Sequence, residues 1–267
     1  METISCPICN SSNFNNHLFL SDRYDLKDKI QFNLVKCICN FIFLNPRPDK
    51  NEILNYYNDI SYAPHNKFSF FYKLAQKISF KWKYGLIKDN FSAHKILDYG
   101  SGKGDFGNYM NARGYEVTSY DPISSNVDIL NLKFDLITMW HSLEHIHDLD
   151  ETLTMLNEKL SPNGLLLIAI PNISAAEKKY LSTKWVAYDA PRHLYHFEQN
   201  SLKNLISKYG FKINQIKPIY QDTFFNIYKS LNMFKMIFFP ILFFISIIEI
   251  LINKSKSSSQ LFICSKI

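Results

Sequence analysis

Residues 96–106 read ILDYGSGKGDF, and this stretch decides the fold. It joins a strand predicted over 95–99 to a glycine-rich turn and to a helix predicted over 105–113. Gly114 ends that helix, and a second strand is predicted over 115–120. Strand, tight turn, helix and parallel strand form the repeating unit of open α/β sheets. The stretch therefore predicts an α/β domain with helices on both faces of a largely parallel sheet.

The glycine-rich turn also indicates a nucleoside cofactor. Its glycines allow a sharp turn that brings main-chain N–H groups against a ligand. Asp121 ends the second strand, 21 residues after Gly100, where an acid can accept hydrogen bonds from both ribose hydroxyls. Asp98, just before the turn, suits the cationic amino-acid part of S-adenosylmethionine and would repel a pyrophosphate. The competing cofactor is a nicotinamide dinucleotide, whose fingerprint is formally met by Gly102, Gly104 and Gly107.

The alternation of strands and helices continues to the end of the chain. Strands are predicted over 134–139, 165–170, 211–219 and 260–264, and helices over about 148–160 and up to 209. The strand at 165–170 is almost wholly apolar, as expected for a strand buried on both faces. Before the sheet, amphipathic helices are predicted from Leu54 and Tyr57 and from Phe70, Leu74 and Ile78.

This part of the chain resembles the class I methyltransferases. Residues 134–145, FDLITMWHSLEH, look like the family's fourth strand and the loop after it, and residues 160–165, LSPNGL, look like the turn into the fifth. Residues 191–197, PRHLYHF, are similar to a segment of a bacterial branch that includes ubiquinone-type and cell-surface glycan methyltransferases. The resemblance implies a Rossmann-like, seven-stranded sheet whose final strand inserts antiparallel beside its neighbours.

The same resemblance implies the residues that bind S-adenosylmethionine. They come from the turn, from the end of the second strand and from the end of the fourth: Asp98, Tyr99, Gly100, Ser101, Gly102, Gly104, Asp121, Pro122, Met139, Trp140 and His141. One departure concerns the adenine side. Only twelve residues separate Asp121 from Phe134, where the family has a helix and a third strand. Residues 127–130 predict a short strand without the helix, which motivates an alternative function as a non-catalytic binding module on the same fold.

A cluster of histidines follows the strand at 134–139. His141, Glu144 and His145 share a face if a helical turn begins at His141. One imidazole is then a candidate general base for an acceptor hydroxyl. Alternatively the three side chains hold a divalent cation, as in the similar Glu-x-x-Glu-His arrangement of ubiquinone-type O-methyltransferases, although a histidine disfavours Mg²⁺. A third interpretation is that they cap a helix and line the cofactor site.

The loop at 185–197 carries a second polar and aromatic group. Its candidate substrate-binding residues are Trp185, Tyr188, Arg192, Tyr195 and His196. The Arg192 guanidinium suits a carboxylate or phosphate, and His193 is a further candidate base beside His141 and His145. The alternative is a structural loop that packs its rings on the sheet edge.

Four cysteines near the N-terminus predict a structural zinc site. Cys6 and Cys9 are spaced as C-x-x-C, and Cys37 and Cys39 as C-x-C. Four thiolates suit tetrahedral zinc and leave no open position for catalysis. The resembling branch has two residues between the second pair followed by glycine, where this chain has one residue and Asn40. The alternative is a ribbon that folds without metal. Cys264, alone in the last strand, is predicted to be a core thiol.

The amino-acid composition limits the classes of partner that this protein can have. A hydrophobic fraction of 46% is too high for a disordered chain, and the net charge of +6 is scattered. This balance suits an anionic small molecule or membrane surface better than nucleic acid, which we do not expect as a partner. The first ten residues contain no secretory signal, so we expect a cytoplasmic protein, or one peripheral at the inner face of the membrane.

An apolar region at 231–252 is interrupted by Lys235, Pro240 and Glu249. Because the chain is predicted to return to the sheet after it, the region is not expected to span a membrane. It is either a helical lid or an interfacial element, with membrane contact through 231–256 near a lipid-linked acceptor.

The predicted organisation is a zinc-ribbon-like subdomain at 1–48, a helical linker or cap at 49–92, and a methyltransferase domain at 93–267. The predicted reaction is methyl transfer to a hydroxyl of a small-molecule, glycan or glycolipid precursor. Quinone-like phenols are the second acceptor class.

Overall fold

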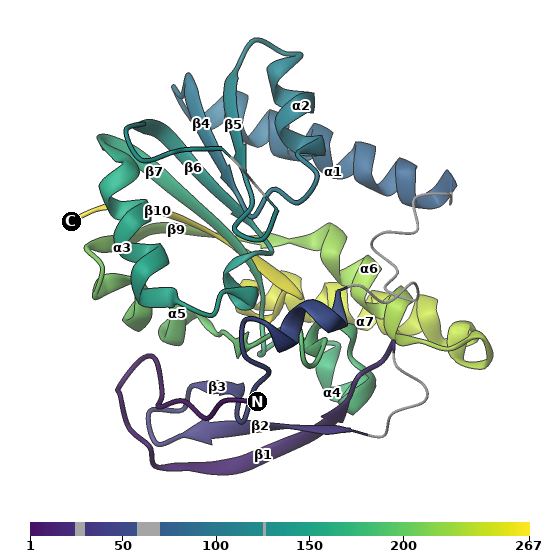
Figure 1. Cartoon of the computed structure of the whole chain (residues 1–267). Helices are drawn as coiled ribbons and strands as arrows, with labels where there is room; N and C mark the ends of the chain where they lie inside the picture. Colours follow the sequence, from purple (N-terminus) through teal and green to yellow (C-terminus); the bar gives the residue numbers. More distant parts are fainter. Residues whose placement is uncertain (25–29, 58–69, 125–126) are drawn as a thin grey trace.

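The computed structural model describes residues 1–24, 30–57, 70–124 and 127–267. Figure 1 shows a large twisted sheet with helices on both faces and a smaller sheet formed mostly by N-terminal residues. The small sheet lies below the carboxyl ends of the central strands of the large one. Both sheets contribute to one hydrophobic core, which runs from Phe43 to Phe262.

The large sheet has six strands in the order β5-β4-β6-β7-β10-β9. They are β4 (Lys95–Tyr99), β5 (Glu116–Tyr120), β6 (Phe134–Trp140), β7 (Leu160–Pro171), β9 (Phe211–Ile219) and β10 (Ser259–Lys266). The strands from β5 to β7 are parallel, whereas β10 lies between β7 and β9 and is antiparallel to both. The predicted antiparallel insertion of the last strand is thus confirmed.

The predicted number of seven strands is wrong for the described part of the chain, which has six strands in this sheet. The missing strand is the one predicted at 127–130, where the described residues form no strand and Val127 and Leu130 are exposed. A parallel strand needs a crossover of a dozen or more residues. The twelve residues between Asp121 and Phe134 are too few for a crossover and a strand together.

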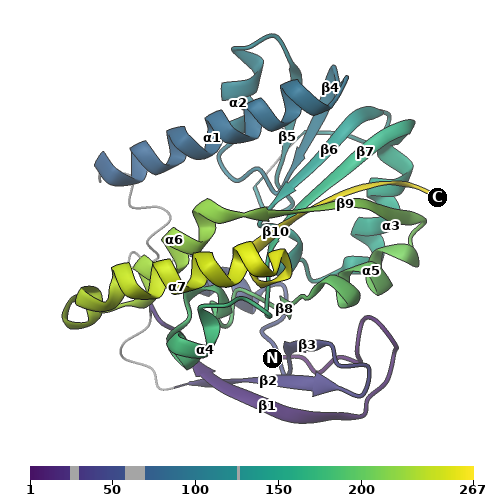
Figure 2. The ribbon, with the colours of Figure 1, turned by 180° about the vertical axis from the view of Figure 1, so that it is seen from behind.

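Helices cover the two faces of the sheet as expected for an α/β domain (Figures 1 and 2). The first face carries α1 (Phe70–Asn90) and α2 (Asp105–Asn111), which bury Ile87 and Met110. The second face carries α3 (Leu149–Lys159) and α5 (Gln199–Ser207), which bury Leu153 and Leu202. The sheet is therefore sandwiched between two hydrophobic layers.

The apolar stripe predicted on α1 does not face the core. Leu74 and Ile78 are 44% and 54% exposed, and the side chain of Phe70 lies outside the described residues. The first half of α1 extends past the sheet in Figure 2, so only its second half, which contains Ile87, has a surface to pack against. Helical spacing alone could not show where the sheet ends.

The small sheet joins the N-terminal segment to the rest of the chain. Its order is β1-β2-β3-β8, with β1 (Phe14–Ser21), β2 (Gln31–Cys37), β3 (Ile42–Leu44) and β8 (Tyr195–His196). Residues 42 and 43 pair with His196 and Tyr195. The segment predicted as a separate subdomain is therefore completed by a strand from the loop at 185–197.

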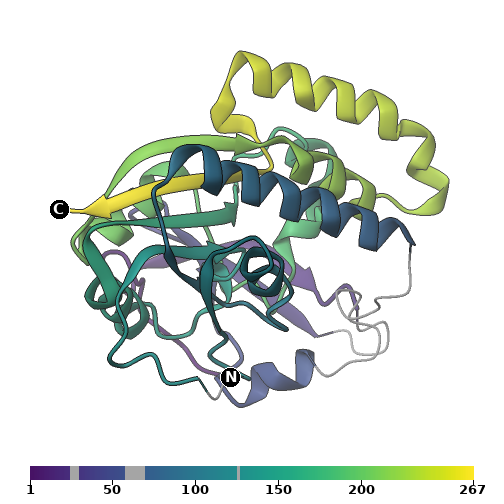
Figure 3. The same cartoon turned by 90° about the horizontal axis from the view of Figure 1, so that it is seen from above.

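The other elements connect these layers. They are η1 (Glu52–Tyr56), η3 (Leu143–His145), α4 (Lys178–Leu181), η4 (Ser182–Lys184), η5 (Val186–Tyr188), α6 (Tyr220–Ser230), η6 (Met233–Phe238), α7 (Phe239–Ile252) and η7 (Lys254–Lys256). Figure 3 shows α7 on the outside of the molecule, running back from η6 towards β10.

A buried ion pair holds the loop at 185–197 against the end of β1. The Arg192 side chain is fully buried, and its Nη2 and Nη1 atoms lie 2.5 and 3.0 Å from the two carboxylate oxygens of Asp22. Nη2 also lies 3.0 Å from Asp189 Oδ1. This parallel, two-bond geometry is the strongest arrangement of arginine with a carboxylate.

We predict that Arg192→Met lowers the free energy of unfolding by about 3–5 kcal/mol, because it leaves two buried carboxylates without their cation. Urea unfolding followed by circular dichroism measures this. The control is Arg113→Met, an exposed arginine whose guanidinium stacks on Tyr109 and whose loss should cost about 1 kcal/mol or less. Equal losses for the two variants would contradict the prediction.

Candidate active site

The glycine-rich turn follows β4 at the carboxyl edge of the sheet. Gly100, Gly102 and Gly104 all have positive φ, a conformation that other residues rarely adopt. At Gly100 a Cβ atom would also lie 2.4 Å from the Ser142 Cβ atom. The turn can therefore pack directly against the loop after β6 only because residue 100 is glycine.

The turn is fastened to the end of β5. The N–H groups of Gly100 and Ser101 donate to the Tyr120 carbonyl at 2.8 and 3.1 Å, and the Gly102 N–H donates to Asp121 Oδ2 at 3.0 Å. The other Asp121 oxygen accepts from the N–H of Ile123. The structure thus brings the predicted ribose-binding acid next to the predicted cofactor turn, and Pro122 follows it at the exposed edge.

Asp98 is buried on the α1 side of the sheet. Its carboxylate accepts a 2.9 Å hydrogen bond from the Thr138 hydroxyl. Burial raises the pKa of Asp98 to about 6, against the opposing effects of Lys83 and Thr138. Part of the positive charge near the Asp98 carboxylate is therefore supplied by the protein, through Lys83.

Lys83, on α1, is a residue of the site that the sequence did not reveal. Its ammonium lies 4.4 Å from the centre of a Trp140 ring and 5.0 Å from the Phe106 ring centre, a cation–π arrangement. Burial lowers the pKa of Lys83 to about 8. The indole N–H of Trp140 is buried and has no acceptor in the described part of the chain. The ammonium and the indole are thus in contact, and both carry hydrogen-bond donors.

Two of the predicted cofactor contacts lie inside the core. Tyr99 and Met139 are 4% and 0% exposed, and the Tyr99 hydroxyl lies 3.4 Å from the Thr152 hydroxyl under α3. Any contact of these two residues with a cofactor would therefore use their main-chain atoms.

His141 is held between two carboxylates. Its Nε2 lies 3.0 Å from Asp222 Oδ2 on α6, and its Nδ1 lies 3.5 Å from Glu144 Oε1. Burial would lower its pKa, but hydrogen bonds and charge from Asp222 and Glu144 raise it to about 10. His141 is therefore an imidazolium cation at neutral pH and a poor proton acceptor. Asp222 is 81 residues away, so the sequence pattern could not indicate this partner.

The helical turn predicted from His141 instead begins at Leu143, as η3. His141 has a φ of 53° and lies outside it. The group with close ligand atoms is Glu144, His145 and His193, whose atoms lie within 4.8 Å of one another. The predicted set of His141, Glu144 and His145 is thus replaced by one that takes its second histidine from the loop at 185–197.

His145 is a neutral imidazole. Burial and His193 lower its pKa to about 4. Its Nδ1 lies 2.9 Å from the Arg192 carbonyl oxygen, and it must carry the proton to donate this bond. Its Nε2 then has the free lone pair of a base. The Nδ1 atom also lies 3.0 Å from the Tyr57 hydroxyl.

Glu144 completes this group. Its side chain is fully buried, and burial would raise its pKa, but His141, His145 and His193 lower it to about 2. A carboxylate buried at this depth must have compensating charge. His141 supplies that charge, so the cation on one side of Glu144 leaves the imidazole on the other side free to stay neutral.

The residues predicted to bind substrate face mostly inward. The Trp185 indole N–H donates to Glu177 at 3.0 Å, and the Tyr188 ring packs on Trp185. Arg47 donates to the Tyr195 hydroxyl at 2.6 Å, and burial lowers the pKa of His196 to about 3.

Arg192 is already paired with Asp22 and Asp189, so binding an anion would break a buried ion pair. The geometry favours the structural interpretation of this loop. A substrate-binding role for its five side chains stays a prediction. It is best supported for Trp185 and Tyr188, which line a pocket of about 210 Å³.

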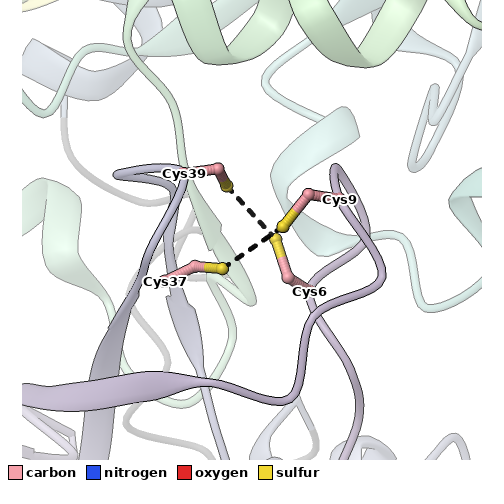
Figure 4. A group of neighbouring side chains, drawn as sticks. All are labelled: Cys6, Cys9, Cys37 and Cys39. Carbon is pink, nitrogen blue, oxygen red and sulfur yellow. Dashed lines mark hydrogen bonds between the residues drawn. The ribbon is translucent and has the colours of Figure 1, made fainter.

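The four N-terminal cysteines come together in Figure 4. The sulfurs of Cys6 and Cys39 lie 3.6 Å apart, those of Cys9 and Cys37 lie 3.4 Å apart, and all four lie within 4.8 Å of one another. Asn40, which stands where the resembling branch has glycine, has a φ of 70°, in the left-handed region that glycine adopts most readily. Asparagine tolerates this region, which explains how the shorter second pair still closes.

Comparison with known proteins identifies the domain. The family model described as "Methyltransferase domain" matches residues 65–216. A ubiquinone biosynthesis O-methyltransferase of Rickettsia canadensis (strain McKiel) is 20% identical over 165 residues, which are 50% of this chain and 69% of that protein.

Two solved structures are also similar. The 1,6-didemethyltoxoflavin-N1-methyltransferase of Burkholderia thailandensis has a TM-score of 0.49 and 13% identity, over 92% of this chain and 99% of that one. The mitomycin 7-O-methyltransferase MmcR has a TM-score of 0.45 and 12% identity, over 71% of this chain and 54% of its own length, so this chain spans about half of it. Because the family match covers more than half of the 267 residues, the chain belongs to the methyltransferase domain family and is an S-adenosylmethionine-dependent methyltransferase.

Proposed function

We propose that this enzyme transfers the methyl group of S-adenosylmethionine to a hydroxyl group, with His145 as the general base. The neutral His145 imidazole beside buried Glu144, at the carboxyl edge of the sheet, is the observation that carries this proposal. The name of the Rickettsia relative, an O-methyltransferase, supports oxygen as the accepting atom. The proposed acceptors are glycan or glycolipid precursors, with quinone-like phenols as the second class.

The residues around the turn fit the cofactor. Asp121 would accept hydrogen bonds from the ribose hydroxyls, at the place where it now accepts from Gly102. Lys83 and the unpaired indole N–H of Trp140 would bind the carboxylate of the amino-acid part, which satisfies a buried donor. Asp98 would face the ammonium group. When bound, the cofactor supplies an electrophilic methyl group on a sulfonium.

The remaining chemistry falls to His145. When the acceptor oxygen takes the methyl group, His145 Nε2 would accept the hydroxyl proton. The Arg192 carbonyl holds Nδ1–H and so keeps this nitrogen available. Alignment of the reactants contributes most of the rate, and proton transfer adds typically about 10²–10⁴-fold.

We also propose that the four cysteines bind structural zinc. A tetrahedron with zinc–sulfur bonds of about 2.3 Å places sulfurs about 3.8 Å apart. The observed distances of 3.4 and 3.6 Å are close to that value. Because four thiolates fill the coordination sphere, the metal would join the turn at Cys6–Cys9 to the end of β2 and take no part in the reaction.

For the cofactor, we predict that Asp121→Asn weakens binding of S-adenosylmethionine by about tenfold to a hundredfold, because hydrogen bonds to a charged group are lost. Isothermal titration calorimetry measures the change. The control is Glu116→Gln, an exposed acid at the start of β5, the strand that ends just before Asp121, and this variant should bind like the wild type. If the wild type itself fails to bind at millimolar ligand, the non-catalytic binding module becomes the better interpretation.

For the base, we predict that His145→Gln lowers kcat/KM by about 10²-fold or more. The control is His94→Gln, an exposed histidine far from η3. A general base can accept a proton only while it is unprotonated, so the activity of the wild-type enzyme falls when His145 becomes protonated. Because the pKa of His145 is lowered to about 4, kcat/KM for the acceptor should stay flat as pH falls through 6.5, the ordinary imidazole value. The measurement uses saturating S-adenosylmethionine, so that protonation of free Asp98, whose pKa is about 6, does not contribute. A fall centred near 6.5, or a loss with His193→Gln alone, would contradict the assignment.

For the metal, we predict about one zinc per purified chain by inductively coupled plasma mass spectrometry. Cys37→Ser should lose it, because three thiolates and a hydroxyl bind zinc poorly. The matched control, Cys264→Ser, replaces a buried cysteine in β10 and should keep the metal. Full-length protein that folds normally with no metal would support the metal-free ribbon.

A further inference from the structure

An apolar surface at the α6–α7 hairpin is not covered by the other described residues of the chain. The helical region Met233–Ile252 is long and apolar enough to cross a membrane, yet only 11% of its most apolar window is buried. Phe234 and Ile237, in η6, are 89% and 76% exposed. A helix that is apolar all round belongs in a core or in lipid. Among the described residues of α7 only Ser246 and Ile250 are buried, so most of this helix lies outside the core.

The exposed side chains form a continuous stripe. Four of them follow at spacings of four, three and four residues, which places them on one helical face: Ile237, Ile241, Phe244 and Ile248. Leu251 and Ile252 extend the stripe to the end of α7. Soluble proteins rarely expose contiguous apolar patches of this kind, and patches rimmed by polar residues mark interaction sites.

The opposite face of α7 is held to the protein by aromatic and polar contacts. Phe239 and Phe243 pack edge-on against the Phe224 ring of α6, at 4.9 and 5.7 Å between ring centres. Lys179, on α4, donates to Glu249 at 2.6 Å. The hairpin therefore has a defined inner face, and the exposed stripe is its outer face.

The topology excludes a single membrane crossing. After α7 the chain returns to β10, which pairs with both β7 and β9 along its length. Both ends of the hairpin are thus fixed to the same body. In addition, the 14 residues of α7 span about 21 Å, less than the hydrocarbon thickness of about 30 Å. In contact with a membrane, the helix would therefore lie along the surface and would not cross it.

The charge around the stripe selects an anionic surface. Between Thr223 and Ser258 there are four lysines and one acid, and that acid is Glu249, already paired with Lys179. The lysines stand at both ends of the apolar region: Lys229, Lys235, Lys254 and Lys256. Each basic residue near an anionic leaflet adds about 1 kcal/mol of attraction.

We propose that the α6–α7 hairpin docks this enzyme on an anionic membrane, with α7 lying in the interface and the four lysines facing phospholipid headgroups. A hollow of about 280 Å³ on this surface has apolar walls with Lys235 at its border, which suits an acyl chain below its headgroup. Docking does not depend on which acceptor is methylated. It does bring the lipid close to the site, because α6 also carries Asp222, the partner of His141.

Vesicle flotation tests this with the full chain and two vesicle compositions, phosphatidylcholine alone and an equal mixture with phosphatidylglycerol. We expect the wild type to float with the mixed vesicles and at least about tenfold less with the neutral ones. The triple variant Phe234→Ser, Ile237→Ser, Phe244→Ser should lower partitioning at least about tenfold, since each removes an apolar side chain from the interface.

Two further variants complete the design. Lys235→Glu with Lys254→Glu should remove the preference for phosphatidylglycerol. The matched control is Leu130→Ser with Ile267→Ser, which are 71% and 79% exposed but lie away from the hairpin, and it should float like the wild type. Near-ultraviolet circular dichroism confirms that each variant is folded.

The proposal fails if the wild type does not float with the mixed vesicles, or if the triple variant floats equally well. It also fails if the wild type is a stable dimer in lipid-free buffer that the triple variant converts to monomer, because the stripe is then covered by a second copy of the chain.

Discussion

The insertion of β10 between β7 and β9 constrains most of this structure. The strand is antiparallel to both neighbours, so the chain must leave the sheet after β9 and return to fill the gap from the opposite direction. The segment from Tyr220 to Ser258 lies outside the sheet, and both of its ends are fixed by the strands β9 and β10. The sheet requires only the returning strand β10, so the helices in this segment do not all have to pack on the core. An apolar helix such as α7 can therefore remain on the outside of the protein.

The same return fastens the loops at the carboxyl edge. The Asn172 side chain donates to the carbonyls of Ser255 and Ser257, and Glu177 accepts from the Trp185 indole and from the Ser258 hydroxyl. The residues just before β10 thus position the start of the loop that later supplies His193. Arg192 and Asp22 position its end. The predicted substrate loop is held in place by polar contacts inside the protein, such as those of Trp185 and Arg192.

The electrostatics of the site divide its histidines into two kinds. His141 is a cation because two carboxylates flank it, whereas His145 is neutral because burial and His193 lower its pKa more than the Arg192 carbonyl raises it. Glu144 stays ionised between them. The His141 cation offsets the negative charge of the buried Glu144 carboxylate, whereas the neutral His145 imidazole keeps a lone pair that can accept a proton. One histidine could not fill both roles, because the first requires a protonated ring and the second an unprotonated one.

The sequence by itself determined the local elements and the cofactor turn. The strands at 95–99 and 211–219 and the positions of Asp121 and the four cysteines follow from patterns of a few residues, because backbone periodicity and turn chemistry are local. Only the tertiary structure decided the charge state of His141, the place of Lys83, the inward direction of Arg192, the absence of a strand at 127–130 and the exposure of Leu74 and of α7. These features depend on which surfaces, far apart in the sequence, come into contact in the fold. Many weak contacts together determine this, so the spacing of residues along the chain does not predict it.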